Sequence, residues 1–153
     1  MNHNGNPNPV ALFFIPTALT AGILFFACVV MFMQSGSDGF QSEDPSQTSL
    51  ITKLSLIHGA VAIVLAFLSH WIYSKLIARV EKPDLQGYLR ALVIKFGLLE
   101  GGALLGLVVV FLADGDILST TPAFYLNYLS SAYMVFEFIR FIPVMKKMHA
   151  SLT

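Results

Sequence analysis

Four long apolar stretches constrain the fold of this chain more than any other feature. They run over residues 10–33, 54–74, 89–113 and 122–145, and most charged residues lie between or beside them. A helix needs roughly 20 apolar residues to cross the hydrocarbon layer of a bilayer, so each stretch is long enough to cross once. The backbone inside that layer must satisfy its own hydrogen bonds, as a helix does. The sequence therefore predicts an all-α membrane bundle of four transmembrane helices.

The low content of charged residues supports this class of protein. Charged residues make up 12% of the 153 residues and hydrophobic residues 56%, whereas soluble domains carry about 25% charged residues. The formal net charge is +0, so we expect no electrostatic attraction to nucleic acid. The links between the stretches are too short for a second folded unit. We therefore expect one membrane domain over residues 1–153, located in the cell membrane.

Positively charged residues predict which ends of the helices face the cytoplasm. Only Lys53 lies near the two outer links. The other basic residues lie in or beside the middle link and near the C-terminal end: Lys75, Arg79, Lys82, Arg90, Lys95, Arg140, Lys146 and Lys147. Cytoplasmic links of membrane proteins carry an excess of Lys and Arg. We therefore expect both termini and the middle link to lie in the cytoplasm.

Small residues predict where the helices pack closely. Glycine lets two backbones approach, and in lipid such packing is what holds helices together. The third stretch contains two successive pairs of glycines four residues apart, and the second stretch contributes one glycine. The five candidate packing positions are Gly59, Gly97, Gly101, Gly102 and Gly106. We therefore expect the third helix to be central, approached on two sides, and the protein to be oligomeric through its small-residue faces.

The fourth stretch carries polar residues along one helical face. Tyr133, Glu137 and Arg140 follow one another at spacings of four and three residues. Such spacings place side chains on the same face of a helix. Polar side chains inside a bilayer are unfavourable against lipid, so this face is predicted to point into protein, where Glu137 and Arg140 can pair directly.

Other ionisable residues are expected at similar depths on the neighbouring helices. Glu100 is placed near the centre of the bilayer, with Glu137 slightly nearer the cytoplasm. Lys95, Arg140 and His70 follow about one to two helical turns further toward the cytoplasm. Lys95 and Glu100 are about 140° apart around their helix, so they cannot easily pair with each other. The predicted contacts are Lys95 with Glu137 or Arg140 with Glu100, and His70 is predicted to form hydrogen bonds in the same polar network.

Glu100 is the first candidate for a functional residue. If Arg140 is held by Glu137, Glu100 has no certain cation, and an unpaired carboxylate in the bilayer favours its neutral form. Glu100 could then take up and release a proton or bind a sodium ion, with Glu137 as a second candidate. The alternative is that the charges form a structural clasp, which fixes how the helices dock.

Cofactor and catalytic chemistry find no support in the sequence. His58 and His70 are twelve residues apart on one predicted helix, roughly 18 Å along its axis, so they cannot share one haem iron. No Cys/His cluster for a metal is visible, and no nucleophile with a base or phosphate-binding loop. We therefore expect no cofactor, no metal and no enzymatic activity.

A small-residue helix, a polar link with Arg and Pro, and a helix with a central carboxylate follow one another over residues 54–112. They are marked by Ala62, Ala66, Arg79, Pro83, Asp84 and Glu100. This arrangement resembles the hairpin of the proteolipid c subunit of rotary ATP synthases. The resemblance implies that Glu100, in the stretch GLLEGGALLGLVVVF, carries the proton or sodium ion. The chain departs from that family in having one further stretch on each side of the hairpin.

These observations predict a small non-enzymatic integral membrane subunit whose buried carboxylate binds or relays a proton or sodium ion. The alternative prediction is a structural or accessory subunit of a membrane assembly, with the intramembrane charges acting as a packing clasp. In either case the expected partners are the lipid bilayer and other membrane subunits or further copies of the same chain.

Overall fold

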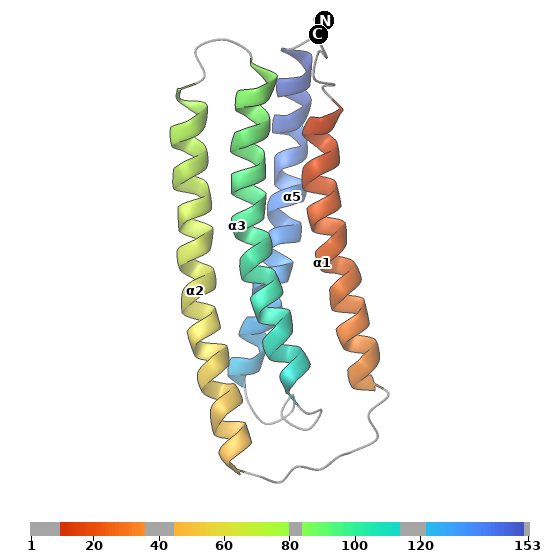
Figure 1. Cartoon of the computed structure of the whole chain (residues 1–153), viewed down its shortest axis with the longest axis vertical. Helices are drawn as coiled ribbons and strands as arrows, with labels where there is room; N and C mark the ends of the chain where they lie inside the picture. The colour runs from red at the N-terminus through yellow and green to blue at the C-terminus, as the bar shows by residue number, and fades with distance from the viewer. Residues whose placement is uncertain (1–9, 36–44, 80–83, 114–121, 152–153) are drawn as a thin grey trace, which may run out of the picture.

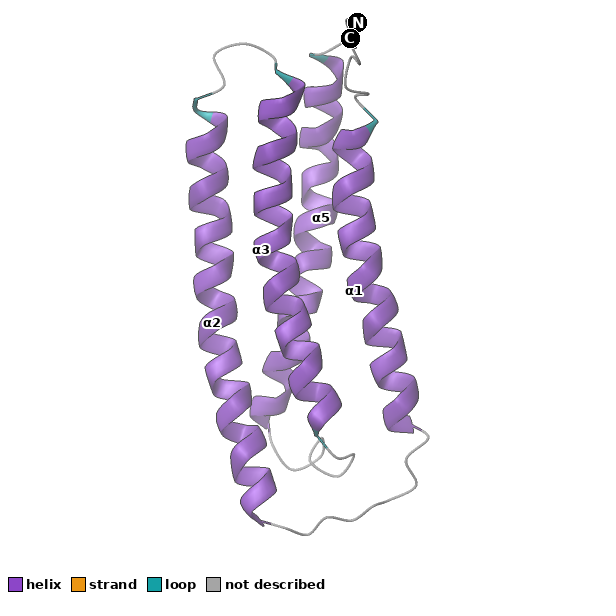
Figure 2. Cartoon of the chain, viewed as in Figure 1, coloured by secondary structure: helices purple, strands orange, loops and turns teal. Residues whose placement is uncertain are grey.

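The computed structural model describes residues 10–35, 45–79, 84–113 and 122–151. All regular secondary structure in these ranges is helical (Figure 2). The elements are α1 (Ala11–Ser35), α2 (Pro45–Ile77), α3 (Leu85–Leu112), the short 3-10 helix η1 (Pro122–Tyr125) and α5 (Leu126–Ala150). The prediction of an all-α fold with four long helices is therefore confirmed.

The four long helices lie side by side along one axis (Figure 1). Helix α3 contacts α1, α2 and α5, and α5 also contacts α1 and α2. Helices α1 and α2 flank α3 on opposite sides (Figure 1). Helix α3 is thus the central helix, as predicted from its glycines.

Three of the long helices are long and apolar enough to cross a membrane. Within the described residues, these candidate spans are Ala11–Met33, Thr48–Ile77 and Leu85–Leu112. Helix α5 has 25 residues, but its glutamate and its basic residues make it less apolar than the other three. The chain therefore fits a membrane protein, and a crossing by α5 stays a prediction.

The helix ends differ from the predicted bounds, and at the starts of α2 and α3 the difference has a physical reason. Helix α2 begins at Pro45, well before the apolar stretch, because a proline fits the first turn of a helix and the polar residues that follow can continue it in water. Helix α3 begins after Asp84, whose side chain accepts hydrogen bonds from the backbone N–H groups of Gln86 and Gly87. The predicted bounds followed apolarity, whereas caps and polar turns extend the helices beyond the apolar stretches.

The core lies where α1, α3 and α5 meet. Its largest fully buried side chain is Phe96 of α3, whose ring contacts Phe138 and Phe141 of α5 edge to face. Large apolar side chains also cover the outside, among them Phe25 and Phe67. Such a surface is unfavourable in water but matches lipid tails. The exterior is therefore consistent with the three candidate spans.

Candidate functional site

Glu137 lies at the centre of a cluster of ionisable side chains contributed by three helices. The side chain is only 1% exposed. Lys95 of α3 donates a hydrogen bond from Nζ to Oε2 at 2.9 Å, and Arg140 donates from Nη1 to Oε1 at 3.2 Å. Nε2 of His70, on α2, lies 3.2 Å from Oε2. The contact predicted between Lys95 and Glu137 is present, as is the pair of Glu137 with Arg140.

The positive charge of Lys95 is stabilised by two aromatic rings as well as by the carboxylate of Glu137. Lys95 is 2% exposed, and its Nζ lies 4.2 Å from the ring centroid of Phe141 and 5.1 Å from that of Tyr73. A cation over a ring face is attracted by the negative face of the π-system. The ammonium group thus has favourable electrostatic contacts on several sides, although it is shielded from solvent.

His70 and Arg140 reach Glu137 from the more exposed side of the cluster. The side chains are 39% and 66% exposed, respectively. Nδ1 of His70 lies 3.0 Å from the carbonyl oxygen of Ala66. A carbonyl and a carboxylate only accept hydrogen bonds, so both histidine contacts are hydrogen bonds when both ring nitrogens carry a proton. Lys95 and Arg140 are two cations against one carboxylate, so Glu137 has its full compensation within the chain.

Glu100 lies apart from this cluster. It is half-buried on α3, and the ion pairs among the described residues all involve Glu137 instead. Arg140, the alternative partner considered for Glu100, is held by Glu137. Glu100, which lies within the candidate span of α3, is therefore left without a cation by the described part of the chain.

The glycines of α3 differ in their surroundings. A Cβ built on Gly106 would lie 2.5 Å from the backbone oxygen of Asn127, and one on Gly102 would meet Leu65 at 3.5 Å. The exposed Gly97 and Gly101 have no such neighbour within 4 Å. Among the glycines of α3, close contacts within the described bundle are thus found at Gly102 and Gly106. Gly97 and Gly101, which were predicted as packing positions, instead lie on a face that points outward.

A second polar cluster, which was not predicted from the sequence, surrounds Gly106. His58 Nε2 lies 2.9 Å from the carbonyl oxygen of Gly102 and 3.3 Å from Oγ of Ser130. Asn127 donates a hydrogen bond from Nδ2 to Oγ of Ser55 at 2.8 Å. Helix α2 contributes Ser55 and His58, and α5 contributes Asn127 and Ser130. The two residues of each helix are three positions apart, a spacing that could have indicated a polar contact between α2 and α5. His58 was considered there only as a haem ligand.

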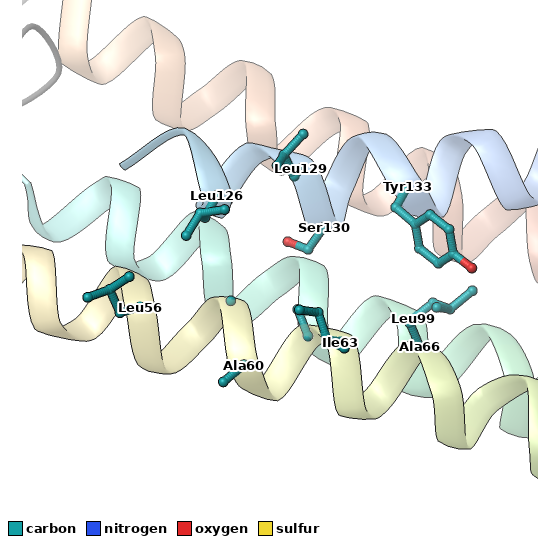
Figure 3. A pocket seen from close by; sticks show the side chains of 11 residues that line it. Leu56, Ala60, Ile63, Ala66, Leu99, Leu126, Leu129, Ser130 and Tyr133 are labelled. Carbon is teal, nitrogen blue, oxygen red and sulfur yellow. The ribbon is translucent and has the colours of Figure 1, made fainter. Parts of the chain in front are cut away.

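An apolar groove of about 520 Å³ runs between α2 and α5, with Leu99 of α3 at its floor (Figure 3). Gly59 and the alanines of α2 form one wall. The lining residues are Leu56, Gly59, Ala60, Ala62, Ile63, Ala66, Leu99, Leu126, Leu129, Ser130 and Tyr133. Tyr133, predicted as part of the polar network, lies at one end of the groove. Gly59, predicted as a packing position, lies close to Leu126 of α5, whose Cδ1 would be 3.3 Å from a Cβ added to the glycine.

Within the ranges that the structure describes, no group of three or more His, Cys, Asp or Glu side chains could hold a metal ion. His58 and His70 both lie on α2 and belong to different polar clusters. Searches against protein-family models, curated proteins and solved structures find no match to this chain. Any functional conclusion therefore rests on the geometry of its own residues.

Proposed function

We propose that the protein is a small non-enzymatic membrane subunit in which Glu100 binds an exchangeable proton or sodium ion. In this proposal four helices cross the membrane, with both termini and the middle link in the cytoplasm. One observation carries the assignment: Glu137 has three partners of basic type, whereas Glu100 has no ion pair among the described residues. An unpaired charge in the hydrocarbon layer is unfavourable, so a bound proton or cation is the expected compensation for Glu100.

The difference in ion-pair partners suggests different roles for Glu137 and Glu100. Glu137 is buried and neutralised by neighbouring helices, which suits a clasp that fixes how α2, α3 and α5 dock. Glu100 is half-exposed at the surface of the bundle, where an ion can reach it without opening the core. We therefore assign ion exchange to Glu100 alone, and a structural role to Glu137.

A hydrophobic carbodiimide tests this assignment, because it reacts with protonated carboxyl groups within the membrane. We expect the purified protein in lipid vesicles to be modified at Glu100, and Glu100→Gln to remove the modification. Glu137→Gln is the control, and peptide mass spectrometry locates the adduct. If sodium is the ion, added sodium should slow the modification. An unmodified Glu100 in the folded protein would contradict an exchangeable site.

The second candidate is an accessory subunit that docks against another membrane helix. It is favoured by the open face beside Glu100, where no atom lies within 4 Å of an added Cβ on Gly97 or Gly101. A partner helix could approach this face closely and place a cation against the carboxylate. The mass of the complex extracted in mild detergent distinguishes an ion-binding subunit from a docking subunit. Loss of a bound subunit from Glu100→Gln, with Glu100 resistant to carbodiimide in the intact assembly, would favour docking.

A further inference from the structure

The groove between α2 and α5 has the length of one leaflet of a bilayer. Along α2 it extends from Leu56 to Ala66, and along α5 from Leu126 to Tyr133. Ten residues of helix rise by roughly 15 Å. That is half of the hydrocarbon thickness of about 30 Å. A hydrocarbon chain of one leaflet could therefore lie along the groove for its full depth.

The groove is an open slot of about 520 Å³. The small residues Gly59, Ala62 and Ala66 of α2 create this slot, because larger side chains there would fill it. An extended apolar chain fits along the slot.

The lining offers almost only apolar surface. Two of the lining residues are polar, Ser130 and Tyr133. The hydroxyl of Ser130 donates a hydrogen bond to the carbonyl oxygen of Asn127. The ring of Tyr133 lies at the end of the groove near Ala66, with its hydroxyl pointing along α5 away from Ser130 (Figure 3). The groove thus makes no demand for a polar ligand group along its length.

A single cation lies at the other end of the groove. Lys53 precedes Leu56 by one helical turn, so both side chains share one face of α2. It is exposed and takes no part in the ion pairs of the described residues. It is also the only Lys or Arg among residues 1–74. Its position beyond the end of the apolar groove is where the phosphate of a lipid headgroup would lie.

We propose that this groove binds one acyl chain of a phospholipid, with Lys53 against the lipid phosphate. The lipid belongs to the leaflet on the side of Lys53, and its chain ends at Tyr133. Glu100 does not line this groove, so the proposal holds whether or not Glu100 exchanges an ion. It differs from the general lipid contact of a membrane protein because the chain is enclosed on three sides, by α2, α3 and α5.

Native mass spectrometry of the full chain titrated with phosphatidylglycerol tests the proposal. We expect one phospholipid to stay bound to the wild type. Ala60→Phe, which adds a ring in the groove, should abolish that binding. Ala21→Phe makes the same change on the exposed face of α1 and should leave it intact. Lys53→Gln should weaken binding about five-fold, the size of one lost contact between a lysine and an anionic headgroup.

Equal binding by the wild type and Ala60→Phe would overturn the proposal, as would equal loss in Ala21→Phe. A protein dimer that Ala60→Phe dissociates, with no bound lipid, would overturn it too. If Ala60→Phe does not fold, Leu129→Trp in a Trp71→Phe background gives a second measurement. Phospholipid brominated along its chain should then quench the fluorescence of this introduced indole at a lower lipid fraction than it quenches the indole of Ala21→Trp in the same background. Equal quenching in the two variants would reject the site.

Discussion

Glu137 is surrounded by more positive charge than it carries negative charge. Lys95 and Arg140 both donate hydrogen bonds to it, and His70 lies within 3.2 Å. The two cations differ in burial, since Lys95 is 2% exposed and the side chain of Arg140 is 66% exposed. Arg140 can extend its guanidinium group away from the core, whereas Lys95 cannot. The buried pair of Lys95 and Glu137 is therefore the part of the cluster whose loss should matter most.

Glu137→Leu is expected to destabilise the protein by about 3–5 kcal/mol, because Lys95 would stay buried without its carboxylate. Combining Glu137→Leu with Lys95→Met should recover part of that loss, since neither charge then remains. Arg140→Leu should cost about 1 kcal/mol or less, because its side chain is largely exposed. Unfolding in mild detergent measures all three. A double variant less stable than Glu137→Leu alone would show that the two residues do not compensate each other.

The members of this cluster were predictable from the sequence, and its pairs of Glu137 with Lys95 and with Arg140 were among the predicted contacts, but the choice of Glu137 over Glu100 was not predictable. Depth along each helix follows from residue number, which placed Lys95, His70 and Arg140 near the two carboxylates. Which carboxylate the cations reach depends on the rotation of each helix about its axis. Rotation is set by packing, here by Phe96 against Phe138 and Phe141, and a single sequence does not reveal it. For the same reason the contact of His58 with Gly102 and Ser130 was missed.

Among the helices, α3 carries the same glycine spacing on a face packed against other helices and on an exposed face. Gly102 and Gly106 are spaced like Gly97 and Gly101, and the sequence alone did not distinguish them. In the structure Gly106 is closed by the backbone of Asn127 and the ring of His58, whereas Gly97 and Gly101 face outward. The spacing predicts that a backbone can come close, but the other helices of the bundle decide where one does.

Gly106→Ala should destabilise the bundle by about 1–3 kcal/mol, because the new methyl group would overlap Asn127 and His58. Gly101→Ala is the matched control on the open face. There alanine should be neutral or stabilising by roughly 0.5–1 kcal/mol, through its higher helix propensity. Thermal unfolding in detergent compares them. If Gly101→Ala is the more harmful change in the isolated protein, another copy or subunit occupies that face.

At the scale of the whole molecule, charge is distributed unequally between the two ends of the bundle. The start of α1, the end of α2, the start of α3 and the end of α5 lie at one end (Figure 1). The basic residues Lys75, Arg90, Lys146 and Lys147 belong to the helix turns nearest that end. A common location for these segments was predicted from the positive-inside rule. The lengths of the apolar stretches identified the helices, but not the polar turns that extend α2.

Cysteine labelling tests the proposed orientation. Cys28 is free and exposed, so it is first replaced in Cys28→Ser. Gln86→Cys, at the start of α3, should react with a membrane-impermeant maleimide only after the membrane is opened, because the middle link is expected in the cytoplasm. Ser49→Cys, near the start of α2, should react in intact cells. The reverse pattern would invert the orientation, and labelling of both from outside would rule out a crossing by α2.

Helix α2 reaches beyond its neighbours at the end opposite the basic residues (Figure 1). The turns from Pro45 to Lys53 add roughly 13 Å of helix to the apolar part. In the proposed arrangement this segment lies outside the apolar part of the span, so its backbone amides should exchange with heavy water faster than those of residues 54–74 when the protein is held in lipid discs. The segment is continuous with the rest of α2. A protein that binds the segment outside the membrane and moves it would therefore also move the part of α2 that carries His58 and His70.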